Sequence, residues 1–429
     1  MFLLLCCQTE RKTALDEQGR RVVFAYRALN NLVLTFRMTM QTSSDSNLNV
    51  LNFLIDNADE AELSLSESIQ IASGGWHTLV LREDGTVWAF GENRYYQLGY
   101  DSGEDIGGLS AESGVLHQVT GIDNVAAIAA GGLHSLALKT DGTVWSWGSN
   151  EYYELGREVT DVCGHDDFGE DLLCSMIPGR VEGLSDVVAI AAGRKHSFAI
   201  TRDGNVWGWG SNRLGELGNS EAGRVNVMTS VQAEGLSDVI QVQGGEGSAA
   251  ALKRDGTVWI WGTSHNGEGA PSVPTEIPDF TDVILIDAKF GHTLALKNDG
   301  TVWVWGSSFS YSFGIDGYED GDTRIPQQIE TLSDITKVAV GYYFNFVVNN
   351  EGDVWCWGNN SYDMLGIEGA EEMYGTLPDI APEPFTDIKL IDAGYYYGVM
   401  VKNDDTIWTW GENFGGSGNN TIPYQLSFE

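Results

Sequence analysis

Residues 141–148 read DGTVWSWG, and six further imperfect copies of this octapeptide occur along the chain. The fifth position is always tryptophan, at Trp88, Trp145, Trp207, Trp259, Trp303, Trp355 and Trp408. By subtraction, consecutive copies are 57, 62, 52, 44, 52 and 53 residues apart. A recurrence of this period indicates a series of stacked supersecondary units, one for each copy.

Each repeat has the pattern of four short strands, as residues 128–148 show (IAAGGLHSLALKTDGTVWSWG). The runs 134–139 and 143–147 flank Thr140-Asp141-Gly142, and Asp-Gly between such runs is a strong hairpin signal. A fourth run, usually marked by proline, follows a variable loop, as in Pro178-Gly179-Arg180-Val181. Seven such sets predict an all-β fold, a seven-bladed β-propeller of four-stranded antiparallel blades.

Three motifs together resemble a known family. They are GxxHSLAL, DGTVWSWG and a Gln-Leu-Gly-like element, found at Gln97-Leu98-Gly99, Glu154-Leu155-Gly156 and Glu216-Leu217-Gly218. The chain resembles the regulator of chromosome condensation repeat family of seven-bladed propellers over roughly residues 68–429. The resemblance implies the fold. It does not fix a function, because propellers of this type look to be used as exchange factors, photoreceptors, enzyme inhibitors and adaptors.

The overall charge limits the classes of partner. The 429 residues include 24 Lys+Arg and 61 Asp+Glu, a formal net charge of −37. Because nucleic acids and anionic membranes are bound by basic surfaces, we expect neither as a partner. High acidity favours solubility, with a specific cation or a basic protein as the alternative explanation. No apolar stretch reaches the roughly 18–20 residues of a membrane-spanning helix.

The residues before the repeats divide into three predicted segments. Residues 1–7, MFLLLCC, form a possible truncated signal segment, although a basic n-region is missing. Residues 8–55 are expected to form a small N-terminal β segment, with a hairpin turn at Asn30-Asn31, and residues 56–68 an acidic linker. An extracytoplasmic or cell-surface location in a bacterium is expected, with a cytoplasmic location as the alternative.

The propeller is assigned residues 69–429, and its closure depends on the last proline-marked run, Ile422–Leu426. If such runs pair with the hairpin that follows them, residues 422–428 must join the blade that begins at Ile71. The ring would then close with both of its ends in one blade, which removes an open sheet edge.

The five cysteines indicate no zinc site, because no CxxC pair or Cys/His spacing occurs. Cys163 and Cys174 bracket one loop and are candidates for a disulfide, with two unrelated surface cysteines as the alternative. Cys356 lies within a third strand, where a buried free thiol is expected.

No residue is predicted to be catalytic and no cofactor is expected. GxSxG, HExxH and Walker-type motifs are absent. Histidine recurs eleven residues before the first tryptophan of four repeats, which favours structural hydrogen bonding over catalysis; the residues are His77, His134, His196 and His292.

A weak calcium candidate occurs in the acidic loop 315–323, IDGYEDGDT, at Asp316, Asp320 and Asp322. Carboxylates clustered with glycines can hold calcium in an extracellular setting, but the spacing is not that of an EF-hand. A solvated loop is therefore the favoured interpretation, and no metal is assigned.

The turn between the first and second strands carries large aromatic residues in four repeats. They are Trp76, Phe290, Tyr342, Tyr343, Tyr395 and Tyr396, whereas the other three repeats have Gly132-Leu133, Arg194-Lys195 and Glu246-Gly247. All seven turns should lie at one end of the propeller, and the four aromatic repeats become neighbours when the ring closes. Clustered Tyr and Trp predict a partner-binding surface. Alternatively, these rings fold back onto the blades.

We therefore expect a non-catalytic protein-interaction scaffold, a monomer whose protein partner the sequence does not identify. One alternative, which the family resemblance implies, is a guanine nucleotide exchange factor for a small GTPase. The other is a secreted enzyme-inhibitor-type propeller, which differs from a scaffold only in its partner.

Overall fold

A computed structural model describes residues 69–100, 115–165, 169–262, 271–308, 311–316, 321–367, 375–381, 384–412 and 420–428. Before residue 69 it describes only the strands β1 (Lys12–Leu15), β2 (Arg21–Phe24), β3 (Ala28–Leu29) and β4 (Leu32–Val33). β3 pairs with β4, with Leu29 opposite Leu32, on either side of the predicted turn. The boundaries of the three N-terminal segments stay predictions, and residues 1–7 and 56–68 lie outside the described residues.

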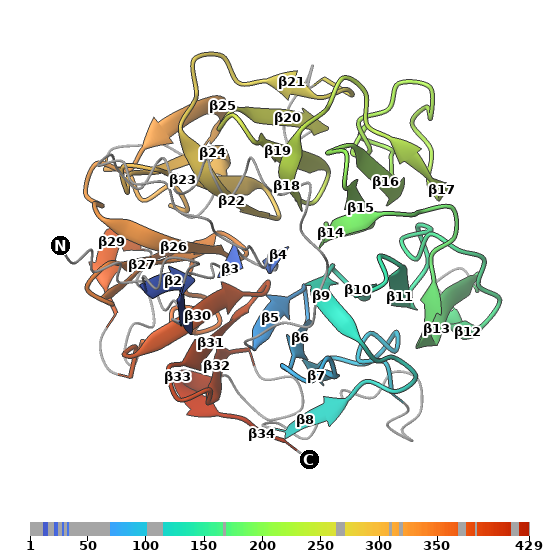
Figure 1. Ribbon diagram of the computed structural model, residues 1–429, viewed down its shortest axis with the longest axis horizontal. Helices are drawn as coiled ribbons and strands as arrows, with labels where there is room; N and C mark the ends of the chain where they lie inside the picture. The colour runs from blue at the N-terminus through green and yellow to red at the C-terminus, as the bar shows by residue number, and fades with distance from the viewer. Residues whose placement is uncertain are drawn as a thin grey trace.

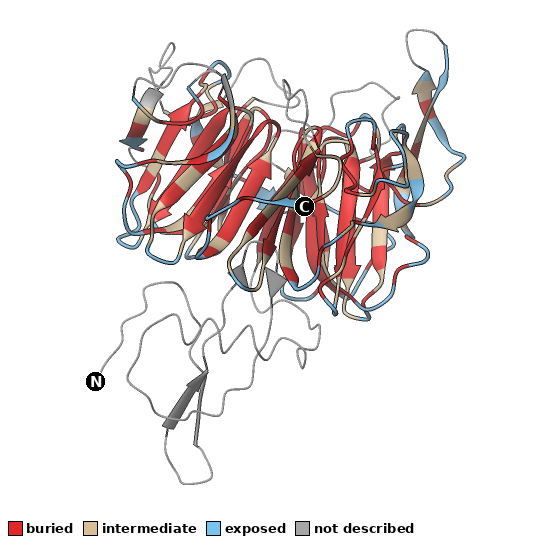
Figure 2. Ribbon diagram, turned by 90° about the horizontal axis from the view of Figure 1, so that it is seen from above, coloured by how far each residue is buried: buried red, intermediate tan, exposed pale blue. Residues whose placement is uncertain are grey.

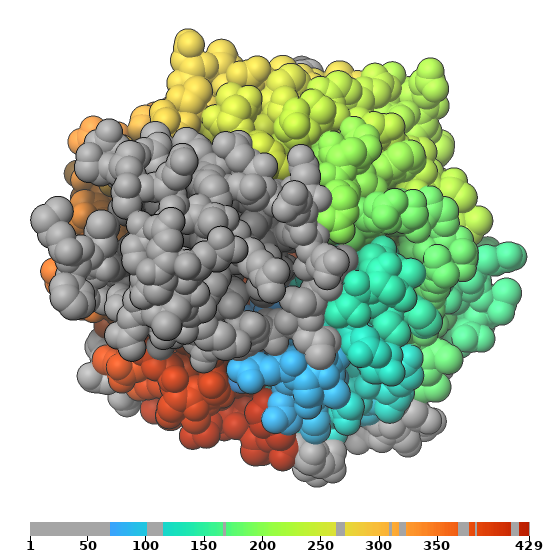
Figure 3. All heavy atoms as spheres, viewed as in Figure 1, coloured from blue at the N-terminus to red at the C-terminus, as the bar shows by residue number. Residues whose placement is uncertain are grey.

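Seven antiparallel sheets follow one another around a ring, as the sequence predicts (Figure 1). Blade one contains β5 (Gln70–Ser73), β6 (His77–Leu81), β7 (Val87–Gly91) and β8 (Val115–Gln118). Blade two contains β9 (Val125–Ala130), β10 (His134–Lys139), β11 (Val144–Ser149) and β13 (Asp171–Arg180), with β12 (Val162–His165) paired to β13. Blade three contains β14 (Val187–Ala192), β15 (His196–Thr201), β16 (Val206–Gly210) and β17 (Val227–Gln232). In the space-filling view the blades succeed one another in chain order (Figure 3).

The remaining four blades have the same order of strands from the centre outward. Blade four contains β18 (Val239–Gly244), β19 (Ser248–Lys253), β20 (Val258–Gly262) and β21 (Thr275–Glu276), and blade five contains β22 (Val283–Lys289), β23 (His292–Lys297), β24 (Val302–Ser308) and β25 (Gly321–Gln328). Blade six contains β26 (Ile335–Val340), β27 (Phe344–Asn349), β28 (Val354–Gly358) and β29 (Gly375–Ile380). Blade seven contains β30 (Ile388–Ala393), β31 (Tyr397–Lys402), β32 (Ile407–Gly411) and β33 (Asn420–Gln425). Among the described residues, no helix is long and apolar enough to span a bilayer.

The hairpin forms in every repeat, at Asp-Gly in the first five and at Glu351-Gly352 and Asp404-Asp405 in the last two. In blade two, Gly142 has φ 78°, and its N–H donates to the carbonyl of Lys139 at 2.9 Å. Leu138 then lies opposite Val144, and Ser135 opposite Trp147. Both faces of the hairpin are buried, because neighbouring blades cover them (Figure 2).

A second aromatic residue stands two positions after the first tryptophan of each repeat, and in five repeats it joins neighbouring blades. In these repeats the residue is a tryptophan, whose indole Nε1 donates to a backbone carbonyl of the preceding blade. The pairs are Trp147 with Gln97 (3.0 Å), Trp209 with Glu154 (2.9 Å), Trp261 with Glu216 (2.6 Å), Trp357 with Ser312 (2.9 Å) and Trp410 with Met364 (2.8 Å). The Gln-Leu-Gly-like element therefore supplies the acceptor for the next blade, which explains why both motifs recur together.

Ring closure differs from the expectation for residues 422–428. β33, which contains the proline-marked run, pairs with β32 of its own blade, and only β34 (Ser427–Phe428) reaches blade one, where it runs parallel to β8. The expected pairing with the following hairpin is wrong, because the third strand of each blade offers its outer edge to the fourth strand of the same repeat. The next run in the chain can pair there by closing only one loop. The closing contact is short but packed, since the rings of Phe428 and Trp88 are 5.2 Å apart.

The first strands line a central channel that contains a cavity of about 110 Å³. Their inner edges carry unpaired backbone groups, and side chains of the preceding blade bond some of them. Gln241 bonds both the N–H and the carbonyl of Ile286, at 3.1 and 2.7 Å. Asp392 accepts from the N–H of Ser73 at 2.7 Å, which joins the last blade to the first. The channel wall is thus held together by side chain to backbone bonds.

Candidate protein-binding surface

The turns between first and second strands form a ring at one end of the channel, which we call the rim. In five cases a backbone N–H in one turn donates to a carbonyl in or beside the next. The bonds are Tyr395 to Gly75 (3.1 Å), Gly75 to Gly131 (2.9 Å), Gly132 to Arg194 (3.1 Å), Arg194 to Gly245 (3.0 Å) and Glu246 to Phe290 (2.7 Å). The turns therefore share one end of the propeller, and each presents two side chains there.

The six aromatic residues predicted to share this end do form one cluster, which we call the aromatic sector. The ring of Phe290 lies 5.3 Å from Tyr343 and 5.9 Å from Tyr395, and the rings of Trp76 and Tyr396 lie 5.1 Å apart. Contacts therefore run between blades that are distant in sequence, which requires the closed ring.

The members of the aromatic sector differ in exposure. Phe290, Tyr343 and Tyr395 retain only 7%, 4% and 8% of their surface and form the floor of the cluster. Trp76, Tyr342 and Tyr396 are half-buried and form its outer face. The rings therefore partly fold onto the blades, and the surface open to a partner belongs to the three half-buried residues.

Two residues of the floor have an unusual backbone. Phe290 and Tyr343 have φ of 54° and 61°, in the left-handed region that bulky side chains rarely adopt. A conformation of this kind costs about 1–3 kcal/mol and persists only where the surroundings enforce it. Here the mutual packing of the two rings supplies that constraint, because each is buried against the other.

A fourth accessible ring was not found from the sequence. Tyr362 is 42% exposed, and its ring lies 4.8 Å from that of Tyr396. It follows β28 instead of lying in a rim turn, so a search of the turns misses it. The available signal is its repeat position, two residues before the first residue of the Gln-Leu-Gly-like element. Tyr95 and Tyr152 stand at that position in blades one and two.

Burial raises the pKa of two tyrosine hydroxyls in the aromatic sector. It raises the pKa of Tyr396 to about 12, with nearby tyrosines adding to the effect. It also raises the pKa of Tyr395, which the neighbouring Arg194 partly opposes. These rings therefore offer neutral apolar faces with hydroxyl groups, which suits recognition better than acid–base chemistry.

Two glutamates border the outer face of the aromatic sector. The N–H of Glu92 donates to the carbonyl of Trp76 at 2.8 Å, and that of Glu412 to the carbonyl of Tyr396 at 2.9 Å. Burial raises the pKa of both carboxyls. Arg94 opposes the shift at Glu92, and the charge of Glu92 adds to it at Glu412. Neither glutamate was predicted from the sequence to belong to a binding surface.

The rest of the rim, blades two to four, is the charged sector. Arg194 of blade three forms an ion pair with Glu246 of blade four. The ammonium of Lys195 lies 3.8 Å from the centre of the Tyr152 ring. Burial lowers the pKa of Lys195, and the neighbouring charge of Arg194 adds to this effect. In this sector side chains of opposite charge, not packed rings, fill the space between the turns.

The recurring histidines lie beneath the rim and are buried. Burial lowers the pKa of His77, His134 and His196 to about 3 and that of His292 to about 4, so all four are neutral. Three of them bond the next blade through Nε2: His77 with Ser135 (2.8 Å), His134 with Ser197 (2.9 Å) and His292 with Asn345 (2.8 Å). This bears out a structural role for those three.

His196 is the exception. Neither of its ring nitrogens has a hydrogen-bond partner among the described residues. The equivalent of Ser135 and Ser197 in the next blade is Ala249, which has no hydroxyl group. The cross-blade bond is therefore missing between blades three and four.

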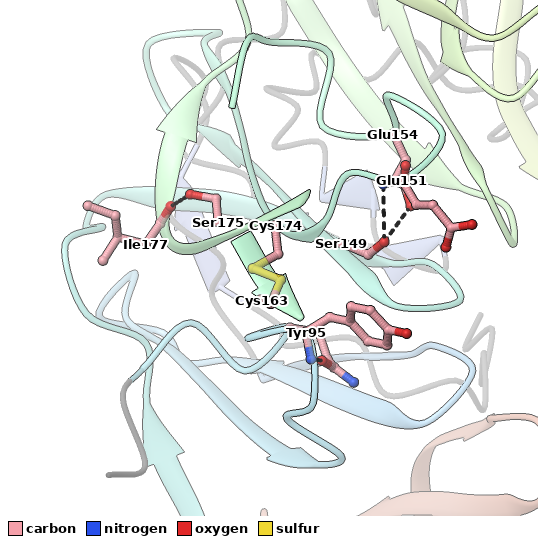
Figure 4. Close-up of a disulfide and its surroundings, with 9 residues drawn as sticks. Tyr95, Ser149, Glu151, Glu154, Cys163, Cys174, Ser175 and Ile177 are labelled. Atoms are coloured by element: carbon pink, nitrogen blue, oxygen red, sulfur yellow. Dashed lines mark hydrogen bonds between the residues drawn. A yellow bond between two sulfur atoms is a disulfide. The ribbon is translucent and has the colours of Figure 1, made fainter. Parts of the chain in front are cut away.

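The two candidate cysteines lie in β12 and β13, where a disulfide joins them with 5.9 Å between the Cα atoms (Figure 4). Cys356 is buried and free, and burial raises its pKa to about 12. Of the calcium candidates, Asp320 and the side chain of Asp322 lie outside the described residues. Within the described part of the chain, no three acidic, histidine or cysteine side chains group as a metal site.

The comparisons with known proteins agree with this architecture. The model of the RCC1-like domain matches residues 41–334, and that of the regulator of chromosome condensation (RCC1) repeat matches residues 335–363. The regulator of chromosome condensation of Mus musculus is 29% identical over 77% of this chain and 80% of its own.

Two further similarities support the fold. The mitochondrial RCC1 domain-containing protein RUG3 of Arabidopsis thaliana is 33% identical over 48% of this chain, which spans 44% of that protein's length. Yeast RCC1 (Prp20), in its crystal structure bound to Kap60, has a TM-score of 0.67 and 20% identity over 91% of this chain and 89% of its own. At that identity the likeness concerns the fold alone.

Proposed function

The chain belongs to the RCC1-like domain family, and from this membership we propose that it is a monomeric, non-catalytic scaffold that docks a protein partner on its aromatic sector. The observation that carries the proposal is the half-buried face formed by Trp76, Tyr342 and Tyr396 on a buried aromatic floor. Tyrosine and tryptophan dominate binding hot spots because they bury a large area at little conformational cost.

Rigidity supports this assignment. The floor residues are packed from three blades, so the outer rings are held in place before a partner arrives. A preorganised face loses less side-chain entropy on binding than a flexible one. The family fold requires no such face, since the same turns in blades two to four carry small or charged residues.

The recurring histidines beneath the rim are placed for structure, not for general-base chemistry. The histidines that recur beneath the rim are neutral and buried, and three of them are committed to bonds between blades. A general base needs a pKa near the working pH and access to substrate. These residues have neither.

The test is partner binding by matched variants. Proteins captured by the intact chain from an extract of the source organism are identified by mass spectrometry, and a purified partner is then titrated. Trp76→Ala with Tyr396→Ala should raise the dissociation constant by about tenfold or more, since truncating a hot-spot aromatic side chain costs about 2 kcal/mol of binding free energy. Leu133→Ala, in the equivalent turn of blade two, is the control. Equal binding by both variants would contradict the proposal.

An exchange factor for a small GTPase is the second candidate, and the similarity to the mouse regulator of chromosome condensation over 77% of this chain favours it. It predicts faster release of bound nucleotide from a small GTPase of the source organism. A rise of about tenfold or more in that rate would replace the scaffold assignment. The enzyme-inhibitor alternative predicts instead that the captured partner is an enzyme that loses activity on binding.

A further inference from the structure

Two glutamates occupy a repeat position that is neutral elsewhere. The residue after the glycine of the octapeptide is serine, threonine or asparagine in blades two to six, at Ser149, Ser211, Thr263, Ser307 and Asn359. It is glutamate only in blades one and seven, at Glu92 and Glu412. Because these blades are neighbours in the closed ring, both departures from the repeat lie at one seam, as we call the contact between two neighbouring blades.

In blades two and three this position has a structural partner. The hydroxyl of Ser149 donates to Glu154 at 2.8 Å, and that of Ser211 donates to Glu216 at 2.8 Å. Glu92 instead faces a repeat whose equivalent of Glu154 is Gln97. Glu92 therefore does not reproduce the serine–glutamate bond that blades two and three form here.

The two carboxylates are poorly compensated. Glu92 keeps 10% of its side-chain surface and has one ion pair among the described residues, with Arg94 at 3.3 Å. Glu412 forms no ion pair within the described ranges, and its Oε2 is buried without a hydrogen-bond partner there. Like charges that are partly buried destabilise a fold, so a cation between them would be favourable.

The rings beside the carboxylates suit the same ligand. The backbone N–H groups of Glu92 and Glu412 donate to the carbonyls of Trp76 and Tyr396, and the rings of Trp76 and Tyr396 lie 5.1 Å apart. An ammonium or guanidinium group against an indole or phenol face gains cation–π energy in addition to its ion pairs. A neutral or acidic group placed here would bury the carboxylates without compensation.

Resting on the proposed function, we infer that the partner docks through a lysine or arginine side chain, which enters between Glu92 and Glu412 against the rings of Trp76 and Tyr396. The aliphatic stem of such a side chain packs on the rings while its charge meets the carboxylates. The net charge of −37 supplies a long-range field that favours the approach of a basic segment.

The test uses a short fluorescent peptide of alternating lysine and alanine, titrated into the full chain and followed by anisotropy. Glu92→Gln with Glu412→Gln should weaken binding by about tenfold, and Trp76→Ala should weaken it by about fivefold. Glu182→Gln with Glu330→Gln removes the same charge from two exposed sites and should change affinity by less than about twofold. The matching glutamate–alanine peptide should not bind.

Equal losses in the two glutamine double variants would show non-specific attraction by an acidic protein and would overturn the inference. Binding of the purified partner by the two kinds of variant distinguishes failure of this inference from failure of the proposed function. If the Trp76/Tyr396 alanine variant loses the purified partner but the Glu92/Glu412 glutamine variant keeps it, the aromatic face binds a partner without a basic anchor. If neither variant loses the partner, both proposals fail.

Discussion

The aromatic and charged sectors of the rim are built on the same backbone ring but filled in different ways. In blades five, six, seven and one, rings from separate turns pack together, with Phe290, Tyr343 and Tyr395 buried. In blades two to four, an ion pair between Arg194 and Glu246 takes that place. The hydrogen-bonded turns thus tolerate either chemistry, so the choice of side chains at the rim is free to serve recognition.

The seams beneath the two sectors also differ. On the aromatic side, His292 bonds Asn345 at 2.8 Å, and the hydroxyl of Tyr397 is 3.0 Å from that of Thr78. On the charged side, blade four has Ala249 opposite His196, and Ser248 stands where other blades have a ring. A cavity of about 50 Å³ lies beside Ser248. Within the charged sector the bond is thus missing between blades three and four, whereas His134 and Ser197 still join blades two and three at 2.9 Å.

The largest effect should come from emptying the aromatic floor. Tyr343→Ala removes a buried ring and should lower the free energy of unfolding by about 3 kcal/mol. Leu133→Ala, at the same turn position in the charged sector, removes a half-buried side chain and should cost about 1 kcal/mol. Chemical denaturation of the two variants checks this. Equal losses would mean that the floor does not support the fold.

A pH-dependent effect is expected on the charged side of the ring, where the buried Glu154 follows β11 of blade two. Burial raises the pKa of Glu154 to about 7, above its ordinary value of 4.5. The folded protein therefore binds this proton more tightly, and its stability falls as pH rises from about 4.5 to about 7. Glu154→Gln should increase stability by about 2 kcal/mol at about pH 8 and by nothing below about pH 4.5.

Melting temperature measured against pH for both proteins tests this prediction. The substitution has a natural precedent in Gln97, which occupies the equivalent position in blade one and accepts from the N–H of Tyr95 at 2.9 Å. A gain that is the same at every pH would show that the buried charge is not its cause.

A smaller effect is expected from completing a seam. Ala249→Ser would give His196 the partner that Ser135 gives His77, and one buried hydrogen bond contributes about 1 kcal/mol. Ser135→Ala removes the existing bond and leaves His77 buried without it, so it should destabilise by about 1–3 kcal/mol. Thermal unfolding of the two variants should shift in opposite directions. A destabilising Ala249→Ser would mean that the seam is closed to a hydroxyl group.

The fold was largely predictable from the sequence because the repeat is local. Each hairpin is specified by its own short turn and by an aromatic pair that begins with tryptophan, so seven copies define seven blades. The gathering of the six rim aromatics also followed, since it needs only ring closure. Their separation into floor and face did not, because exposure depends on contacts such as that of Phe290 with Tyr395, which join distant repeats.

Two features were outside the reach of pattern analysis for a similar reason. The pairing of the fourth strand depends on which sheet edge is free, and the repeat alone fits either neighbour. The proximity of Glu92 and Glu412 depends on the seam between the last blade and the first. A signal for that pair did exist, since both residues replace a neutral repeat position.

The most direct test of the central claim is to map where the captured partner touches the rim. A photo-crosslinking amino acid replaces Tyr362, beside the aromatic sector, or Tyr152, at the same repeat position in the charged sector. We predict that irradiation of the complex gives a covalent adduct with the partner from position 362 and none from position 152. Adducts from position 152 alone would place docking on the charged sector and contradict the account.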